Sequence, residues 1–221
     1  MSRSVAIDGP AGAGKSTIAK LVAKELGFIY VDTGAMYRAM ALYLLRKGID
    51  RNDTDGIESA CELADISLDY VDGQQIVLLM GENVNGYIRT EEVGNMASAS
   101  SVNPKVREKL VSLQQKLASE KDVVMDGRDI GTVVLPDSRC KIYLTASTAV
   151  RAKRRYDELV AKGADADLAQ IEADIAERDE RDMTREHSPL RRAEDAVLID
   201  SSDMTIEEVK DRILEEAGKK L

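Results

Sequence analysis

A glycine-rich loop that ends in lysine and serine stands near the start of this 221-residue chain. Residues 9–16 read Gly-Pro-Ala-Gly-Ala-Gly-Lys-Ser, which matches the G-x-x-x-x-G-K-[ST] pattern of phosphate loops. Glycines let the backbone wrap closely around phosphates, so that successive N–H groups and the next helix N-terminus point at them. We therefore expect Lys15 to contact the β- and γ-phosphates of a nucleoside triphosphate and Ser16 to bind Mg²⁺.

Two carboxylates lie next to apolar segments in positions that suit a phosphate site. Asp126 follows the apolar run 123–125. It resembles the Walker B carboxylate, which helps to place Mg²⁺ directly or through water. Asp8 immediately precedes the phosphate loop, and either a polar role in tightening the turn or a catalytic role would fit it. The sequence thus predicts Ser16 and Asp126 as the metal-binding pair and leaves the role of Asp8 open.

Arginines that suit phosphate binding occur at three places. Four charged residues have the spacing i, i+3, i+4 and i+7 and are expected to share one face of a helix: Arg178, Arg181, Asp182 and Arg185. Arg38 and Arg128 each follow the end of an expected strand, which is where ligands bind in open α/β sheets. The alternatives are a solvated charged helix face and separate structural roles for Arg38 and Arg128.

The apolar pattern predicts the elements that would bring these groups together. Five strand-like segments are expected at 4–8, 28–31, 123–125, 142–144 and 197–199. Helical patterns are expected at 15–26, 35–47, 104–120, 148–162 and 205–214, the last beginning with a Thr205-x-x-Glu208 capping box. This alternation predicts a parallel sheet with helices on both faces.

Residues 66–88 depart from the alternation. Three β-type runs, at 66–71, 75–80 and 84–88, are separated by the turn sequences Asp72-Gly73 and Gly81-Glu82-Asn83. They predict a small antiparallel insert that closes over a second substrate. The chain has no internal repeat or low-complexity linker, so its sub-regions are expected to be insertions in one core.

Five segments, spread from the first strand to the last helical region, resemble the bacterial cytidylate kinases. They are Asp8-Gly9-Pro10, Asp32-Thr33-Gly34-Ala35-Met36-Tyr37-Arg38, Ile88-Arg89-Thr90-Glu91-Glu92-Val93, Asp126-Gly127-Arg128-Asp129-Ile130-Gly131-Thr132-Val133-Val134 and Arg178-Asp179-x-Arg181-Asp182. The resemblance implies an α/β fold of the P-loop nucleoside-monophosphate kinase type: a five-stranded parallel sheet flanked by helices, a small antiparallel β insert and a helical lid. It also implies ATP- and Mg²⁺-dependent phosphorylation of CMP and dCMP to CDP and dCDP by in-line transfer.

The same resemblance implies roles for individual residues. The ATP-binding set would be Gly9, Pro10, Ala11, Gly12, Ala13, Gly14, Lys15, Ser16, Thr17 and Arg154. The CMP phosphate would contact Arg38, Arg128 and Arg185 near Thr33, which stands where many relatives have serine; the cytosine would contact Ser98, Arg107 and Asp129; and the sugar would contact Arg178 and Asp182. The catalytic set would be Lys15, Arg128, Arg178 and Arg185.

The chemistry of cytosine is compatible with these assignments. Its amino group can donate to a carboxylate such as Asp129, while its ring acceptors can take hydrogen bonds from Arg107. Uracil reverses two of these groups, so discrimination could reach the order of 10⁴-fold at best. A phosphate acceptor is already anionic and needs no strong general base, so we expect His187, the one histidine, to be structural or exposed.

The sub-regions expected within the single domain 1–221 follow the same resemblance. Segments 1–34, 93–150 and 186–221 would form the core. Segment 35–92 would be the monophosphate-binding region, with its insert at about 66–88. Segment 151–185 would be a lid that orders over the nucleotides and excludes water.

Composition limits the partners and leaves some alternatives open. A net charge of −9 disfavours nucleic acid, and 4% aromatic residues leave few platforms for base stacking. No apolar run approaches the ~20 residues that span a bilayer. Cys61 and Cys140 suit buried thiols more than a disulfide framework. We expect a cytoplasmic monomer with small-molecule substrates.

The alternative functions are kinases for AMP, dTMP or a small metabolite, a regulatory P-loop ATPase, and an ATPase that binds nucleic acid. The chain has no Asn-Lys-x-Asp motif of the kind that reads guanine.

Overall fold

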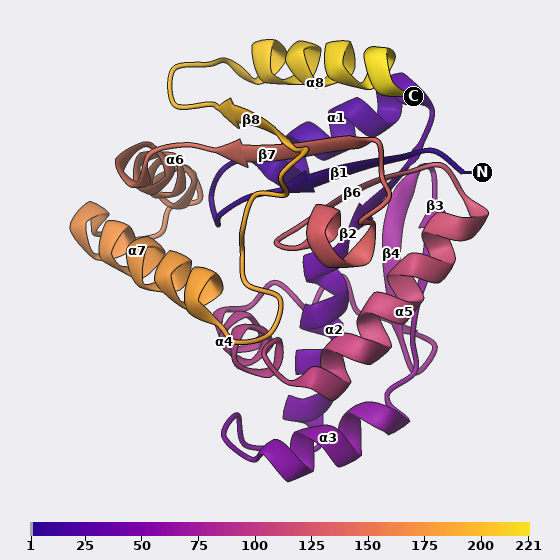
Figure 1. Cartoon of the computed structure of the whole chain (residues 1–221). Coiled ribbons are helices and arrows are strands. Elements are labelled where there is room, and N and C mark those ends of the chain that lie inside the picture. The colour runs from indigo at the N-terminus through magenta and orange to yellow at the C-terminus, as the bar shows by residue number, and fades with distance from the viewer. Residues whose placement is uncertain (1) are drawn as a thin grey trace.

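The computed structural model describes residues 2–221 and is built on a five-stranded parallel sheet. The sheet order is β2-β6-β1-β7-β8. Its strands are β1 (Ser4–Asp8), β2 (Ile29–Asp32), β6 (Val123–Gly127), β7 (Cys140–Thr145) and β8 (Val197–Asp200). In Figure 1, α1 (Lys15–Leu26) and α8 (Ile206–Lys220) cover one face, while α2 (Thr33–Arg46) and α5 (Pro104–Glu120) lie across the other. The predicted parallel sheet with helices on both faces is confirmed.

Side chains of β1 alternate between two layers of core. Val5 and Ile7 pack with residues of α1 and α8, whereas Ala6 packs with Met125 and with Ala118 of α5. Both faces of the strand are buried because helices cover both faces of a parallel sheet. The polar loops at the carboxyl ends of β1, β2 and β6 therefore meet at one edge, where the predicted site residues stand.

Most predicted helices and strands agree with the structure to within a few residues. Helix α2 begins at Thr33 because the Asp32 side chain accepts a hydrogen bond from the Ala35 N–H and caps the helix. Helix α8 has the expected capping box between Thr205 and Glu208 and continues to Lys220, beyond the expected end at 214. Cys61 and Cys140 are buried free thiols, as expected.

Three helices were not predicted: α3 (Thr54–Leu63), α4 (Glu91–Ser100) and the short π-helix η1 (Ile130–Val134). Their sequences contain glycine or several small polar residues, which have weak helix propensity. Helix α4 buries Val93 and Met96, and it packs along α2 in the same apolar cluster. Tertiary packing therefore stabilises helices that local sequence does not.

The insert is a three-stranded antiparallel sheet of β3 (Ile66–Val71), β4 (Gln74–Leu79) and β5 (Glu82–Asn83). The prediction of a third strand at 84–88 is wrong, because the observed third strand, β5, has two residues and ends at Asn83. Beyond the strand, the Asn85 side chain accepts from the Val77 N–H at 3.0 Å and donates to the Gln75 carbonyl at 2.9 Å. One amide side chain thus satisfies backbone groups that a longer strand would have paired.

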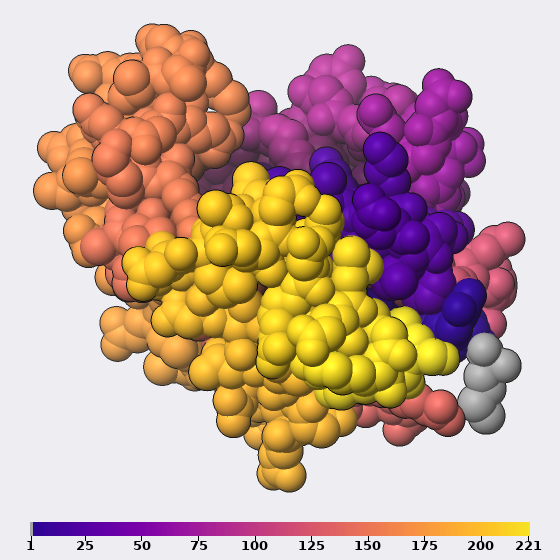
Figure 2. All heavy atoms as spheres, turned by 90° about the horizontal axis from the view of Figure 1, so that it is seen from above, coloured from indigo at the N-terminus to yellow at the C-terminus, as the bar shows by residue number. Residues whose placement is uncertain are grey.

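Helices α6 (Thr148–Ala161) and α7 (Leu168–Thr184) pack against each other at one end of the molecule (Figure 1). Figure 2 shows a groove between this pair, in orange, and the purple to magenta part of the chain. The prediction that Arg185 shares a helix face with Arg178, Arg181 and Asp182 is wrong. Helix α7 ends at Thr184, and Arg185 has the extended angles φ −59° and ψ 141°. A turn follows and leads to Pro189, and a proline cannot continue the helix.

Along residues 2–221, the structure has no helix long and apolar enough to cross a membrane.

Candidate active site

The phosphate loop connects β1 to α1 and depends on glycine at its first position. Gly9 has φ 152°, and a Cβ placed there would lie 1.9 Å from the carbonyl oxygen of Leu144 on β7. Gly12 and Gly14 have φ values of 76° and 85°, which side chains other than glycine rarely adopt. The loop can therefore pass close to the neighbouring strand and turn into the helix within a few residues.

Lys15 is a buried cation at the start of α1. Its ammonium group donates to the carbonyl oxygen of Pro10 at 2.6 Å, and among residues 2–221 it forms no ion pair. Burial, and then the positive charge of Arg128, lower the pKa of Lys15 well below its ordinary value. An anionic phosphate would stabilise the charged form, so the position suits the predicted ligand.

Asp126, at the end of β6, lies within hydrogen-bond distance of the phosphate-loop serine. Ser16 Oγ donates to one carboxylate oxygen at 2.9 Å, and the hydroxyl of Tyr30 donates to the other at 2.8 Å. Burial and then the neighbouring Asp32 raise the pKa of Asp126 to about 6. Mg²⁺ prefers oxygen ligands and often takes one or two carboxylates plus substrate phosphates. A buried carboxylate beside a hydroxyl therefore fits this metal.

Asp8 holds the backbone that follows β6. Its two carboxylate oxygens accept the N–H groups of Ile130 and Gly131, each at 2.7 Å. Burial raises the pKa of Asp8 to about 6, although both hydrogen bonds act in the opposite direction. These contacts show a structural role for Asp8: it ties the phosphate-loop strand to the turn that carries Arg128 and Asp129.

Thr33 and Arg38 lie at the start of α2, on the side of the insert. Thr33 Oγ1 donates to the backbone carbonyl of Asp126 at 2.7 Å. Arg38 donates to the carbonyl of Ile88 at 3.3 Å, and burial followed by the charge of Arg89 lowers its pKa. Among residues 2–221 no carboxylate pairs with Arg38, so its guanidinium is available to a ligand anion.

Arg107 and Asp129 form a buried ion pair between α5 and the segment after β6. Arg185 approaches the other oxygen of Asp129 at 3.9 Å. Ser188 connects the two arginines, because its hydroxyl accepts from Arg107 Nε at 3.2 Å and its carbonyl accepts from Arg185 Nε at 2.6 Å. Three residues predicted to contact CMP are thus brought together from separate parts of the chain.

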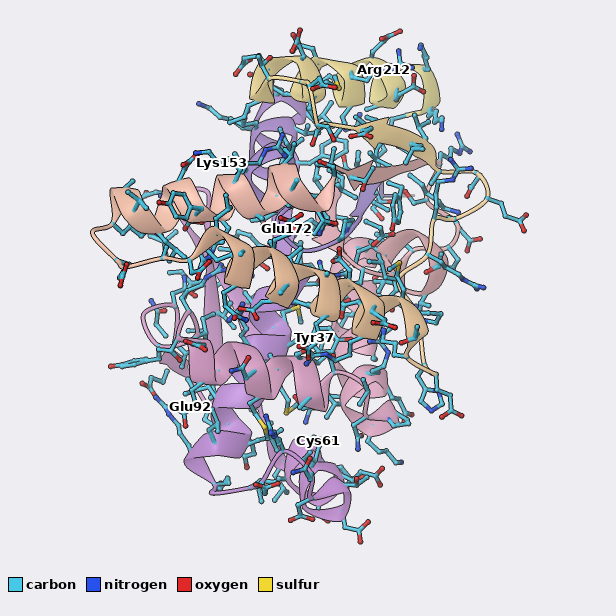
Figure 3. All side chains as sticks on the ribbon, turned by 90° about the vertical axis from the view of Figure 1, so that its left-hand side faces the viewer. Tyr37, Cys61, Glu92, Lys153, Glu172 and Arg212 are labelled. Carbon is cyan, nitrogen blue, oxygen red and sulfur yellow. The ribbon has the colours of Figure 1, made fainter. Side chains whose placement is uncertain are left out.

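Tyr37 borders the same cluster. Figure 3 shows it between α7 and α4. The guanidinium carbon of Arg107 lies 5.8 Å from the centre of its ring. Its hydroxyl is buried and has no hydrogen-bond partner among residues 2–221, which leaves a polar group free for a ligand.

Arg128 and Asp182 also pair, whereas Arg178 has no anionic partner within residues 2–221. Arg128 Nε lies 2.8 Å from a carboxylate oxygen of Asp182, which comes from α7. Arg178 Nε is buried without a hydrogen-bond partner among the described residues. Burial and then the charge of Arg128 lower the pKa of Arg178 to about 10. An unpaired guanidinium beside another cation again suits an anionic ligand.

Other predicted residues stand further from this cluster. Ser98 Oγ on α4 accepts a 3.4 Å hydrogen bond from Arg181, which is exposed on α7. Arg154 is anchored at the start of the loop after β8, where it donates to the Ser201 carbonyl at 2.6 Å. Thr17 and His187 are exposed, and the expectation that His187 is structural or exposed is confirmed.

Sequence reasoning missed Arg151 and gave Asp179 no role. Arg151 is buried in the first turns of α6 and contacts both the phosphate loop and Asp179 of α7. Its position within a run of basic residues, Arg151-Ala152-Lys153-Arg154-Arg155, gave no indication of which one faces inward. The apolar neighbour Ala152, also buried, is the one local signal.

Known proteins match this chain over almost its whole length. A family model described as cytidylate kinase matches residues 5–219. A cytidylate kinase of Caldicellulosiruptor saccharolyticus is 54% identical over 212 residues, covering 96% of this chain and 94% of the relative. A cytidylate kinase of Bacillus subtilis is 48% identical over 217 residues, covering 98% of this chain and 97% of that relative.

Among solved structures, an uncharacterised protein from Eubacterium ventriosum covers 100% of both chains with a TM-score of 0.53 and 13% identity. This likeness concerns the fold alone.

Proposed function

This chain belongs to the cytidylate kinase family, and we propose that it transfers the γ-phosphoryl group of ATP to CMP and dCMP, yielding CDP and dCDP. It is a phosphotransferase whose acceptor is itself a phosphate. One observation carries the proposal: three cations gather at the phosphate loop, where burial and then the charge of Arg128 lower the pKa of both Lys15 and Arg178. Such a group is stabilised when anions bind, and two phosphates brought together supply them.

The residues on the ATP side would hold the donor. Backbone N–H groups of the phosphate loop and the N-terminus of α1 favour negative charge, and Lys15 would neutralise the β- and γ-phosphates. Ser16 and Asp126 would bind Mg²⁺, which supplies charge neutralisation at the phosphates when it is bound. Arg154, anchored at Ser201, would border the nucleotide on the side of β8.

The residues on the CMP side would hold the acceptor in line. Arg38, Arg128 and Arg185 would contact the acceptor phosphate near Thr33, and Arg178 with Asp182 would contact the sugar and steady the phosphates. The acceptor oxygen is anionic at neutral pH, so alignment and charge neutralisation replace a general base. Two buried atoms support these roles, because neither Nε of Arg178 nor Nη2 of Arg185 has a hydrogen-bond partner in the described part of the chain.

Selectivity for cytosine would come from the Arg107–Asp129 pair together with Ser98. Arg107 occupies one oxygen of Asp129, so the other oxygen would accept from the cytosine amino group. Uracil presents an acceptor at that position and would leave the carboxylate unsatisfied.

The proposal extends to movement, location and assembly. Segment 35–92 would close on CMP and segment 151–185 on ATP, since transfer without hydrolysis requires that water be excluded. The groove in Figure 2 supports such closure.

We also propose a cytoplasmic location, where ATP and CMP are found, and a monomer that binds neither nucleic acid nor membrane. Sedimentation at micromolar concentrations tests the monomer.

A label-transfer experiment tests the reaction. ATP labelled in its γ-phosphate is mixed with Mg²⁺ and CMP, and the products are separated. Label in CDP is the expected result. Label in inorganic phosphate at the same rate with and without CMP would show hydrolysis and refute transfer.

A further inference from the structure

We propose that Arg151 and Asp179 are positioning residues that join the phosphate loop to helix α7, so that one buried ion pair aligns the ATP and CMP sides of the site. Neither residue is among those assigned above to either nucleotide. This inference rests on the proposed function and adds two residues to its machinery.

Arg151 makes four polar contacts and is almost entirely buried. Its Nε donates to the Ala146 carbonyl at 2.8 Å, and one terminal nitrogen donates to Thr148 Oγ1 at 3.1 Å, which fix the side chain at the start of α6. The other terminal nitrogen donates to the carbonyl of Ala11 in the phosphate loop at 3.0 Å. The fourth contact is an ion pair of 2.6 Å with Asp179 on α7.

The contact with Ala11 affects the part of the loop that faces phosphate. In a trans peptide the carbonyl and the following N–H point in opposite directions. Holding the Ala11 carbonyl toward Arg151 therefore directs the Gly12 N–H away from Arg151. Gly12 also packs on this side chain, because a Cβ at Gly12 would lie 3.2 Å from Arg151 Cβ. Arg151 thus helps to set the backbone orientation on which phosphate binding depends.

Asp179 fixes the rotation of α7. It stands between Arg178 and the turn that carries Asp182, and adjacent helix positions point about 100° apart. With Asp179 held at Arg151, Arg178 is directed to another face, and Asp182 meets Arg128 at 2.8 Å. Both ends of the ion pair are shielded, with side-chain exposures of 5% for Arg151 and 10% for Asp179. A shielded ion pair is screened little by water or salt, so it can transmit position.

Kinetics of matched variants test this role. Arg151→Gln and Asp179→Asn should each lower kcat/KM by on the order of 10²-fold, because small misplacements of reacting groups have effects of that size. Asp179→Asn should raise the KM for ATP, and Arg151→Gln should raise the KM for CMP, so that each variant affects the substrate on the other side. The double variant should lose no more activity than the worse single variant.

Exposed groups on the same helices serve as controls. Lys153→Gln removes an exposed ion pair with Asp157 on α6, and Asp174→Asn changes an exposed carboxylate on α7. Both should stay within about twofold of the parent. If Arg151→Gln does not fold, Arg151→Lys keeps the charge but cannot make the same set of contacts, and it should still show the rise in KM for CMP. Parental KM values in Arg151→Lys or Asp179→Asn would overturn the proposal.

Hydrogen exchange gives a readout that does not depend on turnover. A non-hydrolysable ATP analogue should slow amide exchange in both the phosphate loop and α7 of the parent protein. In Asp179→Asn it should protect the loop but not α7. Equal protection of α7 in both proteins would overturn the inference. Failure of the parent to phosphorylate CMP, with α7 protection intact, would instead refute the proposed function.

Discussion

Arg107 on α5 and Asp129 after β6 form a buried ion pair although 22 residues separate them in the sequence, and Arg185 approaches the same carboxylate at 3.9 Å. A carboxylate held by two guanidinium groups is fixed in direction. Such a group can act as a rigid acceptor for a donor on the substrate, which is what recognition of the cytosine amino group requires.

Replacing Asp129 tests this base-reading role. Asp129→Asn introduces an amide that can donate to uracil O4, so the ratio of kcat/KM for CMP over UMP should fall by on the order of 10²-fold. Parallel steady-state assays with the two acceptors measure the ratio. Asp137→Asn, which changes an exposed carboxylate, is the control, and its ratio of kcat/KM for CMP over UMP should equal that of the parent. An unchanged ratio in Asp129→Asn would remove Asp129 from base recognition.

Removing Arg185 should impair the acceptor phosphate site while the fold persists. Arg185→Ala should lower kcat/KM for CMP by about 100-fold, the size expected when a charged hydrogen bond is lost, because Asp129 keeps its partner Arg107. The KM for ATP should change little. Arg181→Ala is the matched control, since Arg181 is exposed, and its effect should stay below about threefold. Normal kinetics with a large drop in melting temperature would assign Arg185 to structure alone.

The raised pKa of Asp126, about 6, predicts a metal-dependent pH profile. Protonation removes the charged ligand, so kcat/KM should fall as the pH drops below about 6 at low Mg²⁺. A higher Mg²⁺ concentration competes with the proton, so this acidic limb of the pH profile should move to lower pH. Asp8 has a similarly raised pKa but faces backbone N–H groups, so its titration should not depend on the metal. A limb that does not respond to Mg²⁺ would contradict the role of Asp126.

Stability without ligands should have the opposite pH trend. A carboxyl whose folded pKa is raised binds protons more readily in the folded state than in the unfolded state. The contribution of Asp8 and Asp126 to the free energy of unfolding should therefore increase as the pH falls through about 6. Urea unfolding of Asp126→Asn and of the parent at pH 7.5 and pH 5.5 isolates this contribution. An equal pH dependence in both proteins would contradict it.

The close approach of Gly9 to β7 predicts a large effect of one methyl group. Gly9→Ala would place a Cβ 1.9 Å from the Leu144 carbonyl oxygen, which the sheet cannot move without breaking pairs. We expect a loss of at least about 3 kcal/mol in the free energy of unfolding. Gly163→Ala is the control, because Gly163 has φ 74° with no atom near the added Cβ, and its cost should be about 1–2 kcal/mol. Equal losses would show that no clash exists at Gly9.

The sequence was sufficient for the sheet because each strand is a short apolar run, and the strands β1, β2 and β6 end in motif residues. It was insufficient for α4, whose Gly94 and serines give little helical signal until Val93 and Met96 pack against α2. Likewise, the third strand of the insert was overextended because the side chain of Asn85 takes the place of strand partners. The alternation of apolar and polar residues does not show where a side chain, rather than a neighbouring strand, will pair with the backbone.

Site residues next to a strand end could be predicted from the sequence. Site residues whose position depends on how a helix is rotated were harder to predict. Arg38 and Arg128 follow strands β2 and β6, and the sheet brings them to the same edge. By contrast, the helix pattern grouped Arg185 with Arg181, whereas the chain leaves the helix at Thr184 and turns Arg185 toward Asp129. The inward orientation of Arg151 depends on α6 packing against α7, and the apolar residue Ala152 beside it is the one local signal.

The most direct test of the proposed phosphoryl transfer to CMP is a comparison of acceptors. The rate of ADP formation from ATP and Mg²⁺ is measured with CMP, dCMP, UMP, AMP and dTMP in parallel, with a reaction lacking acceptor as the control. We expect kcat/KM for CMP and dCMP to exceed that for every other acceptor by at least about 100-fold, with negligible ADP in the control. A higher kcat/KM with AMP, dTMP or UMP, or ADP formation that does not need an acceptor, would contradict it.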